Sequence, residues 1–105
     1  MAVFIVMDWD ETEADYFGIV SRMGVQGTPA EGIHLHLAGP AAGGMRIVEV
    51  WDEAAGFEAF VRDVLLPTAA EAGIATKPVY TVVPIGNVFA PGLEVIEKLA
   101  REFAG

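Results

Sequence analysis

The two histidines of the chain, His34 and His36, are the residues whose type and spacing most directly suggest chemistry. They alternate with apolar residues, as in a β-strand, so their imidazoles are expected on one face, about 6–7 Å apart. Glu49 lies in a second apolar stretch, and a hairpin between the two stretches brings its carboxylate to the same face. An imidazole titrates near neutral pH, and a carboxylate can hold it in one tautomer. We therefore predict a catalytic set, with either histidine as the general base and Glu49 as the group that orients it.

Two other interpretations of His34, His36 and Glu49 stay open. Two imidazoles and one carboxylate form a facial ligand set for iron, zinc or manganese. The other interpretation is purely structural and is the commonest outcome for such a pattern. In it, the histidines line a sheet edge that is partly exposed to water, and Glu49 pairs with them or with Arg46. Because the carboxylate is distant in sequence, we predict neither a bound metal nor another cofactor.

The neighbours of the two histidines depend on the register of the hairpin. Pairing of His36 with Ile47 places Glu49 opposite His34, whereas the other parity surrounds the histidines with the residues of the opposite face. We favour the first register because it groups the polar side chains. It also leaves a continuous apolar layer on the other face, made of Leu35, Leu37, Val48 and Val50.

Two aromatic side chains are predicted to contact a substrate. Trp51 ends the second strand of the hairpin on the Glu49 face, where its ring can stack on an aromatic molecule. Tyr16 faces the sheet from a helix, and its hydroxyl can hydrogen-bond a ligand there. Each also has a simpler structural interpretation, as a side chain of the core or of an interface.

Hydrophobic periodicity predicts the strands that must position these residues. Residues 39–44 are rich in glycine and contain a proline, so they sustain neither regular structure and must turn the chain. The predicted strands are residues 3–9, 33–38, 46–51 and 78–84.

Capping and breaking residues predict three helices. The first begins at the N-cap Thr12 and ends at Gly24. The second begins at Asp52, is interrupted by Pro67, which lacks a backbone donor, and continues as a short piece to Gly73. The third opens at Pro91. Its inward face is expected to hold Leu93, Ile96, Ala100 and Phe103, and its outer face the i, i+4 pairs Glu94–Lys98 and Glu97–Arg101.

The resulting order, β-α-β-β-α-β followed by a helix, predicts a ferredoxin-like α+β fold in a single domain over residues 1–105. Right-handed crossovers place both helices on one face of a four-stranded antiparallel sheet. The strands are apolar on both faces, however, and a sheet face in water should be polar. A homodimer that packs two such faces together is the favoured cover, and the C-terminal helix of the same chain is the alternative.

Composition narrows the range of partners. The chain has 15 acidic and 6 basic residues, a formal charge of −9. This charge argues against nucleic acid and against an anionic membrane surface, because both require basic residues. Cysteine is absent, which excludes disulfides, thiol catalysis and thiolate metal sites. No apolar run is long enough to span a bilayer and no signal-peptide pattern is present, so the expected location is the cytoplasm.

One part of the chain resembles a known group of proteins. The run Gly39-Pro40 … Gly43-Gly44-Met45-Arg46-Ile47-Val48-Glu49-Val50-Trp51-Asp52, then Phe57-Glu58-Ala59-Phe60, Leu65-Leu66-Pro67 and Ala72-Gly73-Ile74, is similar to small proteins of the dimeric α+β barrel superfamily. Within it, the likeness is to the antibiotic-biosynthesis-monooxygenase-like group. The resemblance implies a homodimer whose sheets form a barrel with the helices outside. It also implies a pocket between each sheet and its own helices.

The same resemblance bears on the site. Cofactor-free oxygenases of this group use a tryptophan, a tyrosine, an arginine and an asparagine around a quinol. The resemblance implies that Trp51, Tyr16 and Arg46 correspond to the first three of these residues. The sole asparagine, Asn87, follows the last predicted strand and departs from that pattern. Haem-degrading relatives ligate iron through a histidine on a helix, whereas both histidines here lie on a predicted strand, which argues against haem degradation.

These inferences predict a small dimeric α+β barrel protein that binds an aromatic or polyketide-like molecule in a pocket between sheet and helices. The first alternative is a cofactor-independent monooxygenase of the antibiotic-biosynthesis type. The second is a non-catalytic protein-interaction module whose apolar sheet face meets a different chain.

Overall fold

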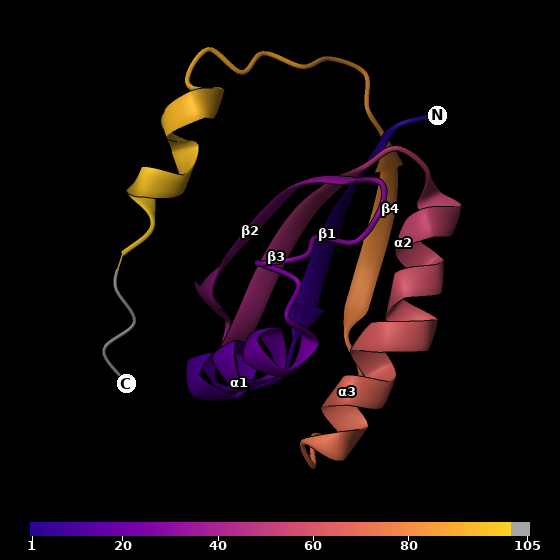
Figure 1. Ribbon diagram of the computed structural model, residues 1–105, viewed down its shortest axis with the longest axis vertical. Helices are drawn as coiled ribbons and strands as arrows, with labels where there is room; N and C mark the ends of the chain where they lie inside the picture. Colours follow the sequence, from indigo (N-terminus) through magenta and orange to yellow (C-terminus); the bar gives the residue numbers. More distant parts are fainter. Residues whose placement is uncertain (102–105) are drawn as a thin grey trace.

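Within residues 1–101, which the computed structural model describes, four strands form one antiparallel sheet (Figure 1). Their order across the sheet is β2-β3-β1-β4, with β3 and β1 in the centre. This order, with the intervening helices, is that of the split β-α-β unit, and it confirms the predicted ferredoxin-like α+β fold. The strands are β1 Val3–Trp9, β2 Ile33–Ala41, β3 Gly44–Trp51 and β4 Val79–Pro84.

The first helix, α1 (Glu13–Met23), carries both end signals expected from the sequence. The hydroxyl oxygen of its N-cap, Thr12, accepts a 3.0 Å hydrogen bond from the backbone N–H of Asp15. Gly24 ends the helix with a φ of 66°, in the left-handed region that glycine adopts without steric cost. These local contacts fix where α1 starts and stops, and its buried side chains define the face that packs on the sheet. Tyr16 is buried on that face.

The second helical segment passes Pro67 without a break, so the predicted interruption is wrong. A π-helical turn precedes the proline: the backbone N–H of Leu66 donates to the carbonyl of Val61, five residues back. The wider turn rearranges the carbonyls that would meet the proline ring in a regular α-helix. The segment consists of α2 (Ala54–Phe60), η1 (Val61–Leu65) and α3 (Leu66–Glu71).

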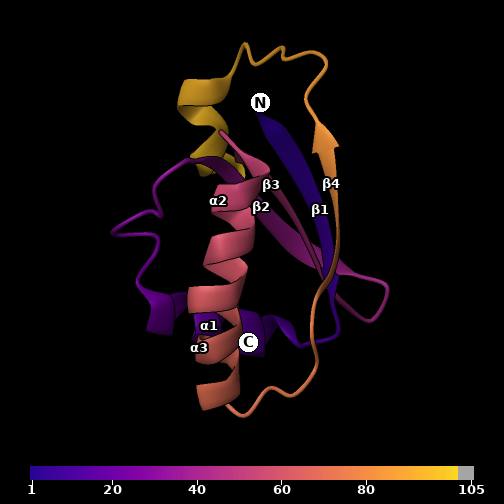
Figure 2. The same cartoon turned by 90° about the vertical axis from the view of Figure 1, so that its right-hand side faces the viewer.

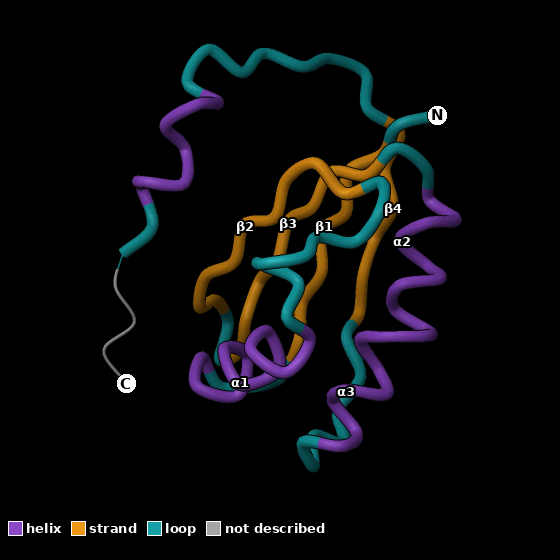
Figure 3. The backbone as a smooth tube through the Cα atoms, in the orientation of Figure 1, coloured by secondary structure: helices purple, strands orange, loops and turns teal. Residues whose placement is uncertain are grey.

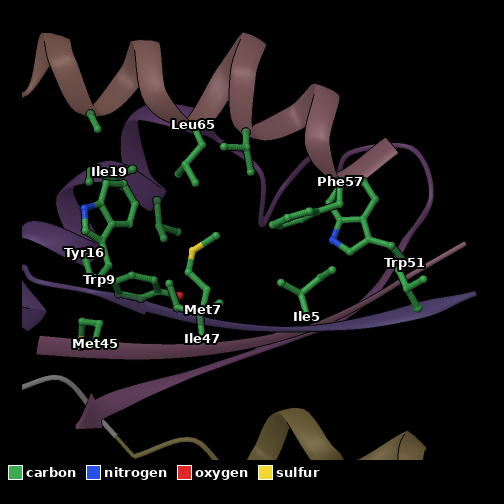
Figure 4. Packing of buried hydrophobic residues seen from close by; sticks show 14 residues of the cluster. Ile5, Met7, Trp9, Tyr16, Ile19, Met45, Ile47, Trp51, Phe57 and Leu65 are labelled. Atoms are coloured by element: carbon green, nitrogen blue, oxygen red, sulfur yellow. The ribbon is translucent and has the colours of Figure 1, made fainter. Parts of the chain in front are cut away.

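Both helical segments cover the same face of the sheet (Figures 1 and 2). Every second residue of β1 is buried on that face, beginning at Val3, which is 5% exposed. Figure 4 shows Ile5 and Met7 between the sheet and the helices, facing Phe57 and Leu65. The layer between sheet and helices is therefore filled by packed apolar side chains.

The hairpin between β2 and β3 is tighter than residues 39–44 suggested. The turn has only two residues, Ala42 and Gly43, with φ of 51° and 81°. Two-residue turns with positive φ match the twist of the strands that they join. The turn pairs Ala41 with Gly44, and the ladder follows from that pair as far as Leu35, before which the register shifts.

The register set by this turn places His36 opposite Glu49 rather than opposite Ile47. The predicted register is therefore wrong by two residues, because it assumed a turn placed earlier in the glycine-rich segment. A shift of two leaves the side chains from Leu35 to the turn on their predicted face, whereas the register shift before Leu35 places Ile33 opposite Trp51. The polar face and the apolar layer of the hairpin are consequently as expected, but the individual partners differ.

The chain after β4 crosses to the other side of the sheet, away from α2 (Figures 3 and 4). It carries η2 (Leu93–Leu99), a 3-10 helix without a buried residue. The inward face predicted for a C-terminal α-helix does not form, since Leu93 is 57% exposed and Ala100 lies beyond the helix end. Phe103, also predicted on that face, lies outside the described residues.

The side of the sheet that faces away from α2 is apolar and incompletely covered. Two rows of paired side chains cross it, and η2 stands off from them across a groove of about 560 Å³. The rows, which we call the open face, are Leu35, Val50, Phe4 and Val83, and Leu37, Val48 and Val6. None of the helices within residues 1–101 combines the length and the apolar character needed to cross a bilayer.

Candidate functional site

The pairing of β2 with β3 places His36 beside Glu49. The Nδ1 atom of His36 lies 2.6 Å from Oε2 of Glu49. A carboxylate only accepts hydrogen bonds, so Nδ1 of His36 is the donor to Glu49. In a neutral imidazole this leaves the lone pair on Nε2, which can then act as a base.

Tyr16 of α1 covers the other nitrogen of this imidazole. Its hydroxyl is hydrogen-bonded to Nε2 of His36, and the two rings lie nearly parallel, at 12°, with centroids 6.0 Å apart. Burial, followed by the negative charges of Glu49 and Glu11, raises the pKa of Tyr16 to about 12. Tyr16 therefore keeps its proton and can donate it in a hydrogen bond to Nε2 of a neutral His36.

Glu49 is held at both carboxylate oxygens. Oε2 accepts from His36, and Oε1 accepts a 2.9 Å hydrogen bond from the indole N–H of Trp51. Trp51 is 1% exposed, and its ring packs edge-on against Phe57 (Figure 4). The structure thus joins four of the predicted site residues in one hydrogen-bonded chain. We call Tyr16, His36, Glu49 and Trp51 the His36 network.

The other two predicted site residues lie apart from this network. Nε2 of His34 is 2.5 Å from Oδ1 of Asp52, and both side chains are exposed. Asp52 is therefore not the N-cap expected for α2; Glu53 holds that position without a side-chain hydrogen bond. Arg46 pairs with Asp8 at 2.8 Å, on the face of the sheet opposite the His36 network.

The separation of the histidines bears on the metal interpretation. His34 is bonded to Asp52 and His36 to Glu49, so the ligand set considered from the sequence is not assembled. Among residues 1–101, no three His, Cys, Asp or Glu side chains are grouped so that they could hold a metal ion.

Sequence reasoning missed Glu11, which lies between β1 and α1. Glu11 is 6% exposed, and in the described part of the chain neither of its carboxyl oxygens has a hydrogen-bond partner. Burial, and then the charge of Asp15, raises the pKa of Glu11 from 4.5 to about 7. The residue follows Asp8 and Asp10, and such an acidic run at a strand end usually faces water. Nothing in the local sequence distinguishes the one member that is buried.

The geometry of the His36 network is suited to proton transfer. The His36 side chain is 32% exposed, so part of the imidazole is in contact with solvent. Trp51, in contrast, is enclosed by core side chains, and its polar contact in this structure is with Glu49. The layer in which the resemblance implied a pocket is occupied by the core.

Comparison with known proteins identifies the fold. No protein-family model and no curated protein matches the sequence. A variant of SnoaB, a cofactor-independent oxygenase from Streptomyces nogalater, is similar with a TM-score of 0.60 and 14% identity, over 83% of this chain and 95% of that one. Rv0793 from Mycobacterium tuberculosis has a TM-score of 0.62 and 11% identity, over 84% and 98%. A hydroxynitrile lyase from Passiflora edulis has a TM-score of 0.56 and 16% identity, over 84% and 96%.

Identities this low show a common fold and no more. A further similar structure is named an antibiotic biosynthesis monooxygenase, with a TM-score of 0.57 and 9% identity. The chain therefore has the fold of these structures, antibiotic biosynthesis monooxygenases among them, which agrees with the fold that the sequence resemblance implied. The matched structures are covered almost completely, so the likeness extends over the whole domain rather than one motif.

Proposed function

We propose that this protein is an enzyme in which His36 removes a proton from a hydroxyl group of a small aromatic or polyketide-like molecule. The observation that carries the proposal is the hydrogen bond between Nδ1 of His36 and Glu49. It leaves Nε2 as the proton acceptor, and the carboxylate stabilises the imidazolium that forms.

The proposed step is a single proton transfer. A substrate hydroxyl replaces the Tyr16 hydroxyl at Nε2 of His36; its O–H bond breaks, the proton goes to Nε2, and the electron pair stays on the substrate oxygen. Because the pKa of Tyr16 is raised to about 12, Tyr16 retains its own proton and can donate a hydrogen bond to the new oxyanion. Trp51 acts indirectly, by holding Glu49.

The surroundings of His36 favour an aromatic substrate. The ring of Tyr16 lies end to end with the imidazole, and Phe17 packs edge-on against Tyr16 with ring centroids 5.1 Å apart. Phe17 is 36% exposed, so an aromatic surface adjoins the partly exposed base. A planar ring can be held there by stacking and edge contacts.

A cofactor-independent oxygenase is the second candidate for the same site, favoured by the likeness to SnoaB. In that case the deprotonated substrate would reduce O₂: a CH₂ group and O₂ become a carbonyl and water, with O₂ from solution as the oxidant. Two observations weigh against it. Arg46 lies on the opposite face of the sheet, and Asn87 lines the groove under η2, so neither joins the His36 network.

We also propose that two copies of the chain associate through the open face. The face is half-buried or exposed, with Leu37 at 45%, and the segment after β4 adds Phe89 at 85% and Leu99 at 77%. An apolar surface of this kind marks an interface. A second copy presents the same surface under two-fold symmetry, which covers both faces in one contact. A different protein chain is the alternative occupant.

The proton transfer can be measured with a probe. 4-Nitrophenol is a phenol whose absorbance changes when its hydroxyl loses the proton. We expect the wild-type protein to raise the fraction of the bound probe that is phenolate, His36→Ala to abolish this effect, and His34→Ala to retain it. Equal phenolate fractions with the wild-type protein and His36→Ala would contradict the proposal. Consumption of O₂ with 1,8-dihydroxyanthrone, a phenol that also has a CH₂ group to be oxidised, would select the oxygenase candidate.

A further inference from the structure

Glu11 and Tyr16 occupy two positions at the start of α1 whose side chains pack against each other in many helices. Glu11 lies one residue before the N-cap Thr12, and Tyr16 is the fourth residue of the helix. The residues at these two positions are usually both apolar. Here both are buried, each 6% exposed, but Glu11 carries a carboxyl group. A residue that breaks a local rule at a buried position often has a role in function.

The carboxyl group of Glu11 is held inside the protein without a bonding partner. Both of its oxygens are buried, and within residues 1–101 neither takes part in a hydrogen bond. The backbone on both sides is fixed: the N–H of Glu11 donates to the carbonyl of Trp9 at 2.9 Å, and the N–H of Tyr16 to that of Thr12 at 3.0 Å. A charge in such a place is screened less than one at the surface, so it acts more strongly on its neighbours.

Tyr16 is the member of the His36 network on which this charge acts. After burial, the negative charges of Glu49 and then Glu11 raise the pKa of Tyr16 to about 12. The charge of Glu11 therefore opposes negative charge on the Tyr16 oxygen. Burial and then the charge of Asp15 raise the pKa of Glu11 itself to about 7, so Glu11 gains and loses its charge near neutral pH.

The other charged side chains around Glu11 do not compensate for it. Apart from the His36 network, those on the segments next to it are Asp10, Glu13, Asp15, Lys77 and Arg101. Glu13 and Arg101 pair with each other at 2.6 Å, and Asp10 and Lys77 are exposed. Residues 40–44, the hairpin tip that also lies beside Glu11, carry no titratable side chain. In the described part of the chain, the Glu11 carboxyl therefore has no cation bonded to it.

We propose that Glu11 is a positioning residue of the His36 network and that its charge decides how tightly an anionic oxygen is held at the Tyr16 hydroxyl. When Glu11 is protonated, the hydroxyl donates to such an oxygen, as in a phenolate, without opposition. When Glu11 is ionised, its charge repels the phenolate. A phenolate that binds therefore draws a proton from solution onto Glu11, and it binds more tightly below about pH 7 than above it. The inference rests on the function proposed for His36, which brings a substrate oxygen to this place.

Glu11→Gln removes the charge and keeps the length of the side chain, so it tests the inference without a ligand. We expect the pKa of Tyr16 to be lower in this variant than in the wild-type chain, as followed by the ¹³Cζ NMR signal of Tyr16 in alkaline solution. Glu11→Asp keeps the charge and should behave as the wild type. Asp10→Asn removes a neighbouring exposed charge and should leave the titration of Tyr16 unchanged. A Tyr16 titration that is the same in Glu11→Gln and in the wild type would overturn the inference, whether or not His36 is a base.

A phenolate tests the consequence for binding. 2,4-Dinitrophenol is ionised and phenol is neutral at both pH 5.5 and pH 8.5, and the NMR signals of Tyr16 and His36 report the binding of each. We expect Glu11→Gln and the wild type to bind dinitrophenolate equally at pH 5.5. At pH 8.5, Glu11→Gln should bind it about tenfold more tightly than the wild type, because only the wild type then carries the repelling charge. Phenol should bind to both chains equally at both pH values.

Other outcomes contradict the inference. Equal affinities for dinitrophenolate at pH 8.5, the same difference for phenol, or no binding of dinitrophenolate at pH 5.5 would each overturn it. A phenolate that is already ionised in solution separates the two proposals, because no proton has to reach His36. If Glu11 alters its affinity but the wild-type protein does not deprotonate 4-nitrophenol, the function proposed for His36 is wrong and the role of Glu11 in anion binding stands.

Discussion

Tyr16 meets His36 end to end, with its hydroxyl on Nε2 and the planes of the two rings nearly parallel, at 12°. The two residues come from α1 and β2, 20 residues apart in the chain. Glu49 holds the opposite nitrogen at 2.6 Å. The imidazole therefore has a fixed orientation and tautomer before any ligand arrives, which is the preorganisation that a general base requires.

Tyr16→Phe removes the hydroxyl and keeps the ring beside the imidazole. We expect the free energy of unfolding to fall by about 0.5–1.5 kcal/mol, the usual net contribution of one hydrogen bond. Urea unfolding measures this loss. The ¹⁵N signal of Nε2 in His36 should also move, while the signals of His34 stay in place. An unmoved Nε2 signal would show that the hydroxyl does not bind there in solution.

Both carboxylate oxygens of Glu49 accept a hydrogen bond, one from His36 and one from Trp51. Glu49→Gln replaces one of these acceptors with an NH₂ donor, so one of the two N–H groups loses its acceptor. The imidazole is the group that can adapt, so its proton should move from Nδ1 to Nε2. The free energy of unfolding should drop by about 1–3 kcal/mol, because the site is buried. ¹⁵N NMR reports the tautomer directly. Asp52→Asn is the matched control and should affect His34 only; a change at both histidines would contradict the separation of the two pairs.

Glu11 should make stability depend on pH. Its pKa is about 7 in the folded chain and 4.5 without the effects of burial, so between these values the folded state binds the extra proton. Stability is therefore highest below about pH 4.5, falls as the pH rises, and has lost about 3 kcal/mol from this group above pH 7. Urea unfolding from pH 4 to pH 8 should show the decline in the wild-type chain and a flatter curve in Glu11→Gln. Parallel curves would contradict the raised pKa.

Gly44 is required by a close approach of two strands. A Cβ at this position would collide with the carbonyl oxygen of Trp9 and crowd Asp10. Gly44→Ala should cost about 1–3 kcal/mol of unfolding free energy, because the strands must move apart. Gly39→Ala in the same hairpin is the control, since a Cβ there meets nothing within 4 Å. Equal losses in the two variants would argue against this packing.

Leu37→Asp tests the homodimer. A charge on the open face, here at its β2 edge, should prevent two copies from packing there, because it would be buried without a partner. Sedimentation velocity should find the wild-type protein near 22 kDa, twice the 11.1 kDa chain, and the variant near 11 kDa. Ala38 is the next residue of the same strand and is exposed. The control variant Ala38→Asp should therefore remain a dimer. A monomeric wild-type protein would favour a different chain as the occupant of this face.

Features that depend on neighbours in the sequence were predictable without the structure. The alternation of β1, the N-cap Thr12 and the left-handed Gly24 all follow from contacts within a few residues. So does the face on which His36 and Glu49 lie, because side chains alternate along any strand. The resemblance, together with this element order, also led to the correct fold.

Other features were decided by tertiary structure alone. The partner of His36 depended on a two-residue turn at Ala42 and Gly43, one of which is not a glycine, and a shift of two residues leaves the polar pattern unchanged. Pro67 could stay within a helix because a π-helical turn accommodates it. Glu11 became buried because the hairpin tip lies against it. Local interactions determine whether a segment is a helix or a strand and which of its faces is apolar. The burial of a side chain and its hydrogen-bond partner depend on contacts between segments that are distant in the sequence, and the sequence pattern does not show which segments meet.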